Sequence, residues 1–141
     1  IIYSREQSFG SKQLLNDIQR NYGNSYEEAN LVLTKGDLPS EAQTKIVTPF
    51  CGSACQEVTR ALQLFYSSNN AMNIDKLLLL GGCSKLSPLA EQLSQSLKID
   101  VKRPDLFESF EKEPTISEKL LESQSSSLTT ALGLAARGIL V

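Results

Sequence analysis

The sequence contains no histidine and only three cysteines among its 141 residues. Without histidine it has no Ser-His or Cys-His catalytic pair, and most zinc sites are excluded because they use histidine ligands. The cysteines, Cys51, Cys55 and Cys83, form no C-x-x-C pair. An odd number of cysteines in this arrangement favours a reducing compartment over a disulfide scaffold.

Long apolar segments and a strong excess of one charge are also absent. No stretch approaches the roughly 18 apolar residues of a membrane-spanning helix, and the start shows no signal-peptide pattern. The net charge is −2, so we do not expect nucleic acid as the main partner, because phosphate binding needs a basic surface. The length suits one domain or one lobe of something larger, and the start at Ile1 without methionine suggests a piece of a longer protein.

The strongest pattern lies in the middle of the chain. The apolar run Leu77–Leu80 ends in Gly81 and Gly82, a short polar turn follows, and a helical pattern opens at about Leu86. Such a run predicts a strand that is buried on both faces. Glycine lacks a Cβ, so a ligand can lie against the main chain, and a helix start adds unpaired N–H groups and partial positive charge. A tight strand-to-helix turn without a ligand fits the same pattern equally well.

Before this stretch the chain is mainly helical. Weak alternation predicts a strand at Ile1–Gln7. The residue before a proline avoids the helical region, so we expect an interruption at Thr48–Pro49. The apolar spacing, a Ser25–Glu28 capping box and the glycines predict these helices: 11–22 closed by Gly23, 25–36 ending at Gly36, one opening at Pro39, and a long one after Pro49 ending near Ser68.

After the glycines the pattern returns to alternating helix and strand. Leu86, Leu89, Leu93 and Leu97 share one helical face, and Ile99–Arg103 predicts a short strand parallel to the first. Five apolar residues beyond it are candidates for a covering segment: Phe107, Phe110, Ile116, Leu120 and Leu121. Residues 128–138 predict a helix whose small residues allow close packing. We therefore predict an α/β fold, with a central, mostly parallel sheet and a helical insertion.

Several of these segments, in this order, resemble the second lobe of the PilM family of type IV pilus assembly proteins. They are Ser4-Arg5-Glu6, Phe9-Gly10 with the helix after it, the helix Glu57–Ser68, the turn Leu80–Ser84 and the closing run Ala131–Gly138. The family is similar to the cell-division protein FtsA within the actin-like ATPase superfamily. The resemblance implies one lobe of an actin-like (ribonuclease H-like) fold, with residues 1–9 and 72–141 as its sheet subdomain and residues 10–71 as an inserted helical subdomain.

The resemblance also implies a role in pilus biogenesis and twitching motility. A member of this family is a cytoplasmic, ATP-binding scaffold that lies peripheral to the inner membrane and links to its alignment complex. It holds the cytoplasmic tail of PilN, mainly through the first lobe, which is absent here. Self-association through a surface that the lobe normally hides is a further expectation.

Four positions in the glycine turn match the superfamily's adenosine site. Gly81, Gly82 and Cys83 match the adenosine-binding turn, and Lys85 matches a position that can lie over the adenine. Lysine stands where arginine is more usual, and lysine stacks less well on a purine. The resemblance therefore implies contact with the base through bare backbone and one ammonium group.

Three positions elsewhere match the same site by resemblance. Glu57 and Arg60 match helix positions that reach the ribose and base, and Gly10 matches the glycine where the chain enters the helical subdomain. Residues three apart share one helix face, so a carboxylate for the ribose hydroxyls and a guanidinium for the purine would lie together. The alternative is that Glu57 and Arg60 form an exposed pair within their own helix.

The phosphate-binding hairpins of the superfamily, with their catalytic acids and magnesium contacts, have no counterpart in this sequence. We therefore assign no catalytic or metal residue, and expect no ATP hydrolysis and only weak adenosine affinity from this chain alone. Whether the full-length protein is a weak ATPase stays open. The alternatives are a lobe of an FtsA-like or other actin-like ATPase or kinase, and an interaction module that has lost its nucleotide site.

Overall fold

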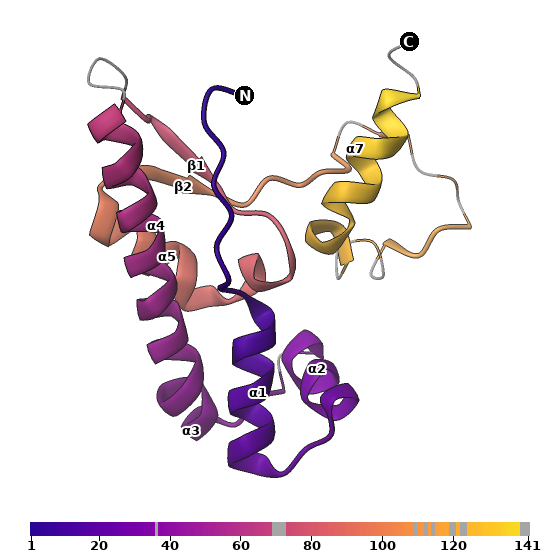
Figure 1. The fold of residues 1–141 in the computed structure, drawn as a ribbon. Coiled ribbons are helices and arrows are strands. Elements are labelled where there is room, and N and C mark those ends of the chain that lie inside the picture. The colour runs from indigo at the N-terminus through magenta and orange to yellow at the C-terminus, as the bar shows by residue number, and fades with distance from the viewer. Residues whose placement is uncertain are drawn as a thin grey trace.

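A computed structural model describes residues 1–35, 37–68, 73–108, 110–111, 113, 115–118, 121 and 124–138 (Figure 1). Helices dominate, and the strands form a small parallel sheet. The elements in chain order are α1 (Ser11–Tyr22), α2 (Tyr26–Lys35), α3 (Ser40–Ala42), the π-helix η1 (Gln43–Val47), α4 (Thr48–Ser68), β1 (Lys76–Leu78), the 3₁₀ turn η2 (Gly82–Lys85), α5 (Ser87–Leu97), β2 (Asp100–Lys102), the 3₁₀ turn η3 (Ser125–Leu128) and α7 (Thr129–Arg137).

The first two helices confirm the sequence prediction. Helix α1 ends at Gly23, whose φ of 68° is the left-handed conformation that glycine adopts easily. Helix α2 begins with the capping box: the Ser25 amide donates to Glu28 Oε2 at 2.8 Å, and the Glu28 amide donates to Ser25 Oγ at 3.2 Å. The predicted stop at Gly36 lies outside the described residues.

The predicted interruption at Thr48–Pro49 is wrong. Thr48 has helical dihedrals, and α3, η1 and α4 follow one another without a gap. The π-turn explains this continuity. A proline inside an α-helix clashes with the carbonyl four residues earlier and cannot donate to it. In η1 the Thr48 amide instead donates to the carbonyl of Gln43, five residues back, and this wider turn accommodates Pro49.

The sheet is a βαβ unit, as predicted. Strand β1 pairs in parallel with β2, Leu77 lying opposite Val101, and α5 connects the two strands. The predicted N-terminal strand is wrong: residues 1–7 pair with no strand among the described residues, and their side chains are exposed. Without a neighbouring strand to bond its backbone, this segment lies along α4, where the Tyr3 ring meets Phe65 at a centroid distance of 5.6 Å.

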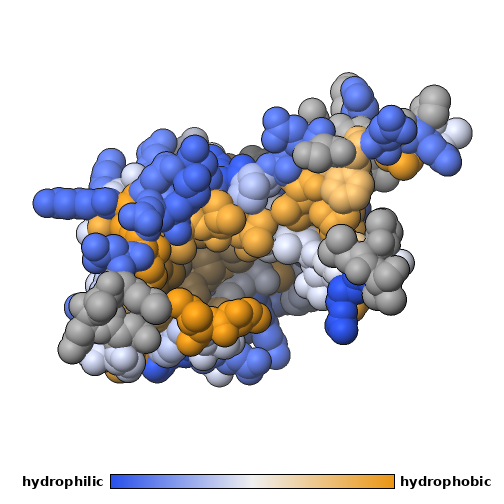
Figure 2. Space-filling view, turned by 90° about the horizontal axis from the view of Figure 1, so that it is seen from above, coloured by the Kyte–Doolittle hydropathy of each residue, from blue (hydrophilic) through white to orange (hydrophobic). Residues whose placement is uncertain are grey.

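Burial on both faces of the first strand is also wrong. Leu77 and Leu79 pack against the core, whereas Leu78 and Leu80 are 52% and 43% exposed. Within the described residues, helices therefore cover one face of the sheet only. The view from above shows apolar surface around a hollow on the molecule (Figure 2).

The core lies between α1, η1, α4 and α5. Its fully buried side chains include Leu14, Ile18, Val47, Cys51 and Leu93. The predicted close packing of the C-terminal helix is wrong, because α7 has no buried residue and Leu134 on it is 61% exposed. Helix α7 stands apart from the helical core (Figure 1).

The covering segment is also different from the prediction. Phe107 and Phe110 contact each other, with ring centroids 6.1 Å apart. Phe110 and Ile116 stay 45% and 48% exposed, and Leu120 lies outside the described residues. In the part of the chain that the structure describes, these aromatics therefore form a local cluster and do not anchor a lid over the core.

Candidate functional site

The two adjacent glycines form a corner where the chain leaves the sheet. Gly81 has φ 88°, a conformation that side-chain-bearing residues rarely adopt. Its amide donates to the Ser126 carbonyl at 2.9 Å, which ties the corner to η3. Its carbonyl accepts from the Ser84 amide at 3.1 Å and from Ser84 Oγ at 2.7 Å. The corner is therefore held on both sides by hydrogen bonds.

Gly82 lies on the wall of a cavity of about 690 Å³, which we call the Gly82 cavity. A Cβ placed on Gly82 would meet no atom of a non-neighbouring residue within 4 Å, so no side chain plugs the corner. Leu33, Leu38, Leu86 and Pro88 supply apolar wall. This volume lies within the range of small-molecule sites.

The polar groups of the cavity come from several elements. Helix α2 contributes Asn30 and Thr34, η1 contributes Gln43, and Ser127 follows the η3 serine that binds the corner. Lys85 alone carries a charge among the described lining residues. Ser87 at the start of α5 also lines the cavity, and an eleven-residue helix places partial positive charge there. The electrostatics therefore favour an anionic or polar ligand.

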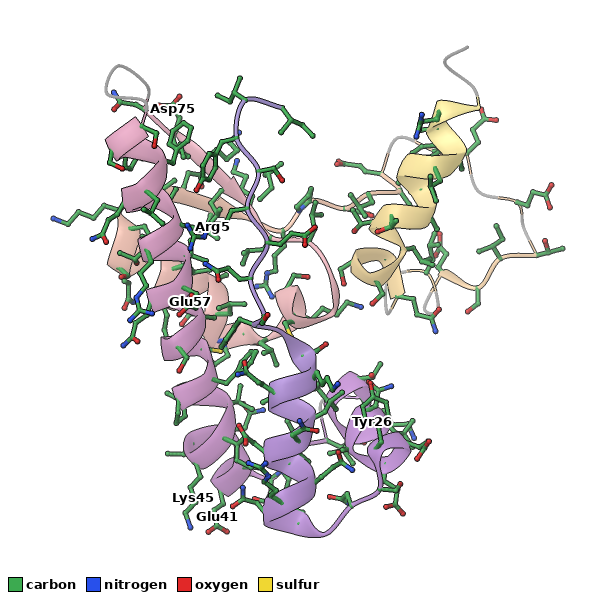
Figure 3. The ribbon with its side chains drawn as sticks, in the orientation of Figure 1. Arg5, Tyr26, Glu41, Lys45, Glu57 and Asp75 are labelled. Carbon is green, nitrogen blue, oxygen red and sulfur yellow. The ribbon has the colours of Figure 1, made fainter. Side chains whose placement is uncertain are left out.

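Glu57 and Arg60 do not line this cavity. They form an ion pair within α4, Arg60 Nη1 to Glu57 Oε1 at 3.0 Å, which is the alternative that the sequence left open. With Arg5 and Gln7 of the N-terminal segment they line a separate shallow recess (Figure 3). The Arg60 side chain is 67% exposed. The structure therefore does not bring this pair together with Gly82 and Lys85.

The remaining candidates lie next to the cavity without lining it. Gly10 precedes Ser11, which lines the cavity, but Gly10 itself faces another shallow recess. Cys83 packs against the core, whose buried residues include Cys51 and Cys55. Burial raises the pKa of all three thiols, that of Cys51 to about 11. A thiol with a raised pKa stays protonated and is a poor nucleophile.

The sequence interpretation missed the contribution of α2. Its capping box fixed where the helix begins, and Asn30 and Thr34 are four apart and so share a face. The sequence prediction for this segment gives its helical bounds, 25–36, and assigns no site residue on it. The polar pair was visible in the sequence, but nothing local indicated that it lies opposite the glycine corner.

The described residues also bear on two other kinds of site. They contain no group of three or more His, Cys, Asp or Glu side chains that could hold a metal ion. No helix among them has both the length and the apolar character needed to cross a bilayer.

Comparison with known proteins relates the chain to a protein family and to a solved structure. Residues 1–139 match the protein family described as type IV pilus assembly protein PilM. A solved structure titled "PilM-PilN type IV pilus biogenesis complex" has a similar fold, with a TM-score of 0.76 and 24% sequence identity. The match covers 96% of this chain and 38% of the other, so the present chain spans less than half of that protein.

Proposed function

The chain belongs to the PilM family of type IV pilus assembly proteins, and from this premise we propose that it is the nucleotide-binding lobe of a scaffold for type IV pilus assembly. The observation that carries the nucleotide part is the unobstructed Gly82 in a cavity with Lys85 and the start of α5. Bare backbone offers a flat surface to a purine, and the positive groups suit a nucleotide's charge. We infer that the ligand is the adenosine part of ATP.

We propose that different residues at the cavity contact different parts of the nucleoside. Gly82 and Lys85 contact the base, as the resemblance implies, with Gly81 and Cys83 shaping the turn. Asn30 and Thr34 are placed to bond a ribose or base edge, because both line the same cavity. The geometry favours this pair over Glu57 and Arg60, which lie in the separate recess.

We further propose that this lobe binds without catalysing. The described lining of the cavity contains no carboxylate that could act as a general base or hold magnesium. When ATP is bound, the phosphates and their magnesium would be handled by residues outside this chain. A malachite-green assay on the chain with ATP should give phosphate release no faster than buffer.

The partners are proposed for the whole protein. A relative of similar fold was solved as a complex named for PilM and PilN. We propose that the full-length protein holds the cytoplasmic tail of PilN, mainly through its other lobe, and is cytoplasmic and peripheral to the inner membrane. The division into a sheet subdomain, 1–9 and 72–141, and a helical subdomain, 10–71, belongs to the same proposal.

One observation favours a second candidate, an interaction module without nucleotide. Glu57 and Arg60 bond each other, so the ribose and base clamp implied by the resemblance is not assembled around Gly82. The family match favours either pilus role over a lobe of an FtsA-like or other ATPase or kinase.

ATP titration into the full-length protein separates the two candidates. Gly82→Val places a branched side chain in the open wall, and we expect it to weaken ATP binding by at least about tenfold, as measured by calorimetry. Gly133→Val is the matched control, because Gly133 lies on α7 and also has open space at its Cβ position. No ATP binding by the wild type would favour the interaction module, and equal ATP affinity of the wild type and Gly82→Val would show that the nucleotide does not bind at Gly82.

A further inference from the structure

The π-helix η1 lies between two hollows. Its first residue, Gln43, lines the Gly82 cavity. Lys45 and Ile46, in the same turn, line a second hollow of about 480 Å³ that we call the α1 groove, bordered by α1, η1 and the first turns of α4. Helix α1 also borders both, through Ser11 in the cavity and Gln13 in the groove. A change in η1 therefore alters both hollows.

Two hydrogen bonds from Thr48, the first residue of α4, end on one carbonyl of η1. Gln43 O accepts the Thr48 amide and also Thr48 Oγ1, the latter at 3.0 Å. The next residue, Pro49, has no amide to donate. The sequence alone predicts a break at this place, and the structure bridges it by a π-turn. Such turns are rare in α-helices and occur frequently at functional sites.

We propose that Gln43–Pro49 is a hinge with two arrangements, and that nucleotide in the Gly82 cavity selects the π-turn. This rests on the proposed function. In the alternative arrangement the helix breaks before Pro49, and Gln43 rotates by roughly a quarter turn out of the cavity. A ligand that contacts Gln43 binds only the π-turn arrangement and shifts the population toward it.

Opening of this hinge also affects the α1 groove. Lys45 and Ile46 move with η1, while Pro49 and Phe50 stay with α4, so opening changes the shape of the α1 groove. Ile46 and Val47 are 6% and 1% exposed, and opening uncovers them. The open form is therefore the minor one, and amide hydrogen exchange is the observable that reports it.

Hydrogen exchange of the full-length protein, with and without ATP, tests the hinge. We expect ATP to slow exchange of the amides of residues 44–48 and of Phe50. Thr48→Val removes the second bond to Gln43 O and should speed this exchange. Its ATP affinity should change by less than about twofold, because the π-turn arrangement stays the major form and Thr48 lines neither hollow. In Gly82→Val, ATP should leave the exchange unchanged.

Thr44→Val is the matched control. Thr44 is an exposed threonine in the same turn, but its Oγ1 donates to Ser40 O at 3.1 Å, in the preceding helix α3, and not to Gln43 O. It should keep wild-type ATP affinity and the wild-type response. ATP binding without slower exchange at residues 44–48 and Phe50, or equal effects of the two threonine variants on this exchange, overturns the hinge and leaves the proposed function standing. A wild type that binds no ATP overturns both.

Discussion

At the scale of single residues, two neighbouring glycines serve different purposes. Gly81 is required by its backbone, because φ 88° is strained for any other residue. Gly82 has no positive φ, and its lack of a side chain keeps the cavity wall open. The pair of glycines could be found in the sequence, but the backbone dihedrals were needed to separate a conformational role from a steric one.

The raised pKa of the Cys51 thiol allows its burial in the core to be tested by measuring the free energy of unfolding at alkaline pH. The Cys51 pKa is raised from 9.0 to about 11 by burial, so the unfolded thiol loses its proton first as the pH rises. The contribution of Cys51 is therefore present below pH 9 and is lost as the pH rises toward about 11. We expect the free energy of unfolding, from urea titrations at about pH 8 and about pH 10.5, to fall less in Cys51→Ala than in the wild type.

The comparison of the two proteins removes the contribution of lysines and tyrosines, which titrate in the same range. Equal losses of stability in both would show that the Cys51 thiol is not shielded from water in solution.

At the scale of elements, the helix α2 connects local sequence to the site. Its start is set by Ser25 and Glu28, and its polar face carries Asn30 and Thr34 into the cavity. The capping bonds lower the pKa of the Glu28 carboxyl. The helix start was predictable because a capping box involves residues only three apart, whereas the cavity depends on η2, far along the chain.

Ser25→Ala should lower the free energy of unfolding by about 1 kcal/mol, since it leaves an orphan amide at the first turn of α2. Ser67→Ala is the control: Ser67 is exposed, and its Oγ bonds Leu64 O within its own helix, so the change should stay within about 0.5 kcal/mol. Urea titration near neutral pH measures both.

The difference in unfolding free energy between the wild type and Glu28→Ala should shrink as the pH falls below 4.5, because the pKa of the Glu28 carboxyl is lowered chiefly by the bond from the Ser25 amide, which favours the charged carboxylate. A difference that persists unchanged in acid would contradict a role for the reciprocal bond of Glu28.

At the scale of the whole molecule, the sheet has one covered and one uncovered face. Leu77 packs against the core and Leu78, beside it, is 52% exposed, although the apolar run predicts burial of both. Apolar side chains on both faces are typical of strands between two layers. The sequence pattern is therefore typical of a sheet between two covering layers. The described residues supply the sheet and one of these layers.

A pair of lysine substitutions distinguishes the faces. Leu77→Lys should cost more than about 2 kcal/mol of unfolding free energy, because the charge must enter the core, whereas Leu78→Lys should change it by less than about 0.5 kcal/mol. Leu78→Lys should also reduce self-association of the chain at high concentration, because it interrupts exposed apolar surface. Urea titration and light scattering measure these effects. A large loss of stability in Leu78→Lys would show that its face is buried in solution.

The sequence by itself determined the local elements and their order: the ends of α1, the capping box of α2, and the two parallel strands joined by α5. These follow from contacts between residues three or four apart and from glycine and leucine spacing. The tertiary structure alone decided that α2, and not the Glu57 face of α4, lines the cavity at the glycine corner. It also decided that a π-turn carries the helix through Pro49, and that one face of the sheet is covered. Each of these depends on which surfaces meet when segments distant in sequence pack, and no local pattern encodes that choice.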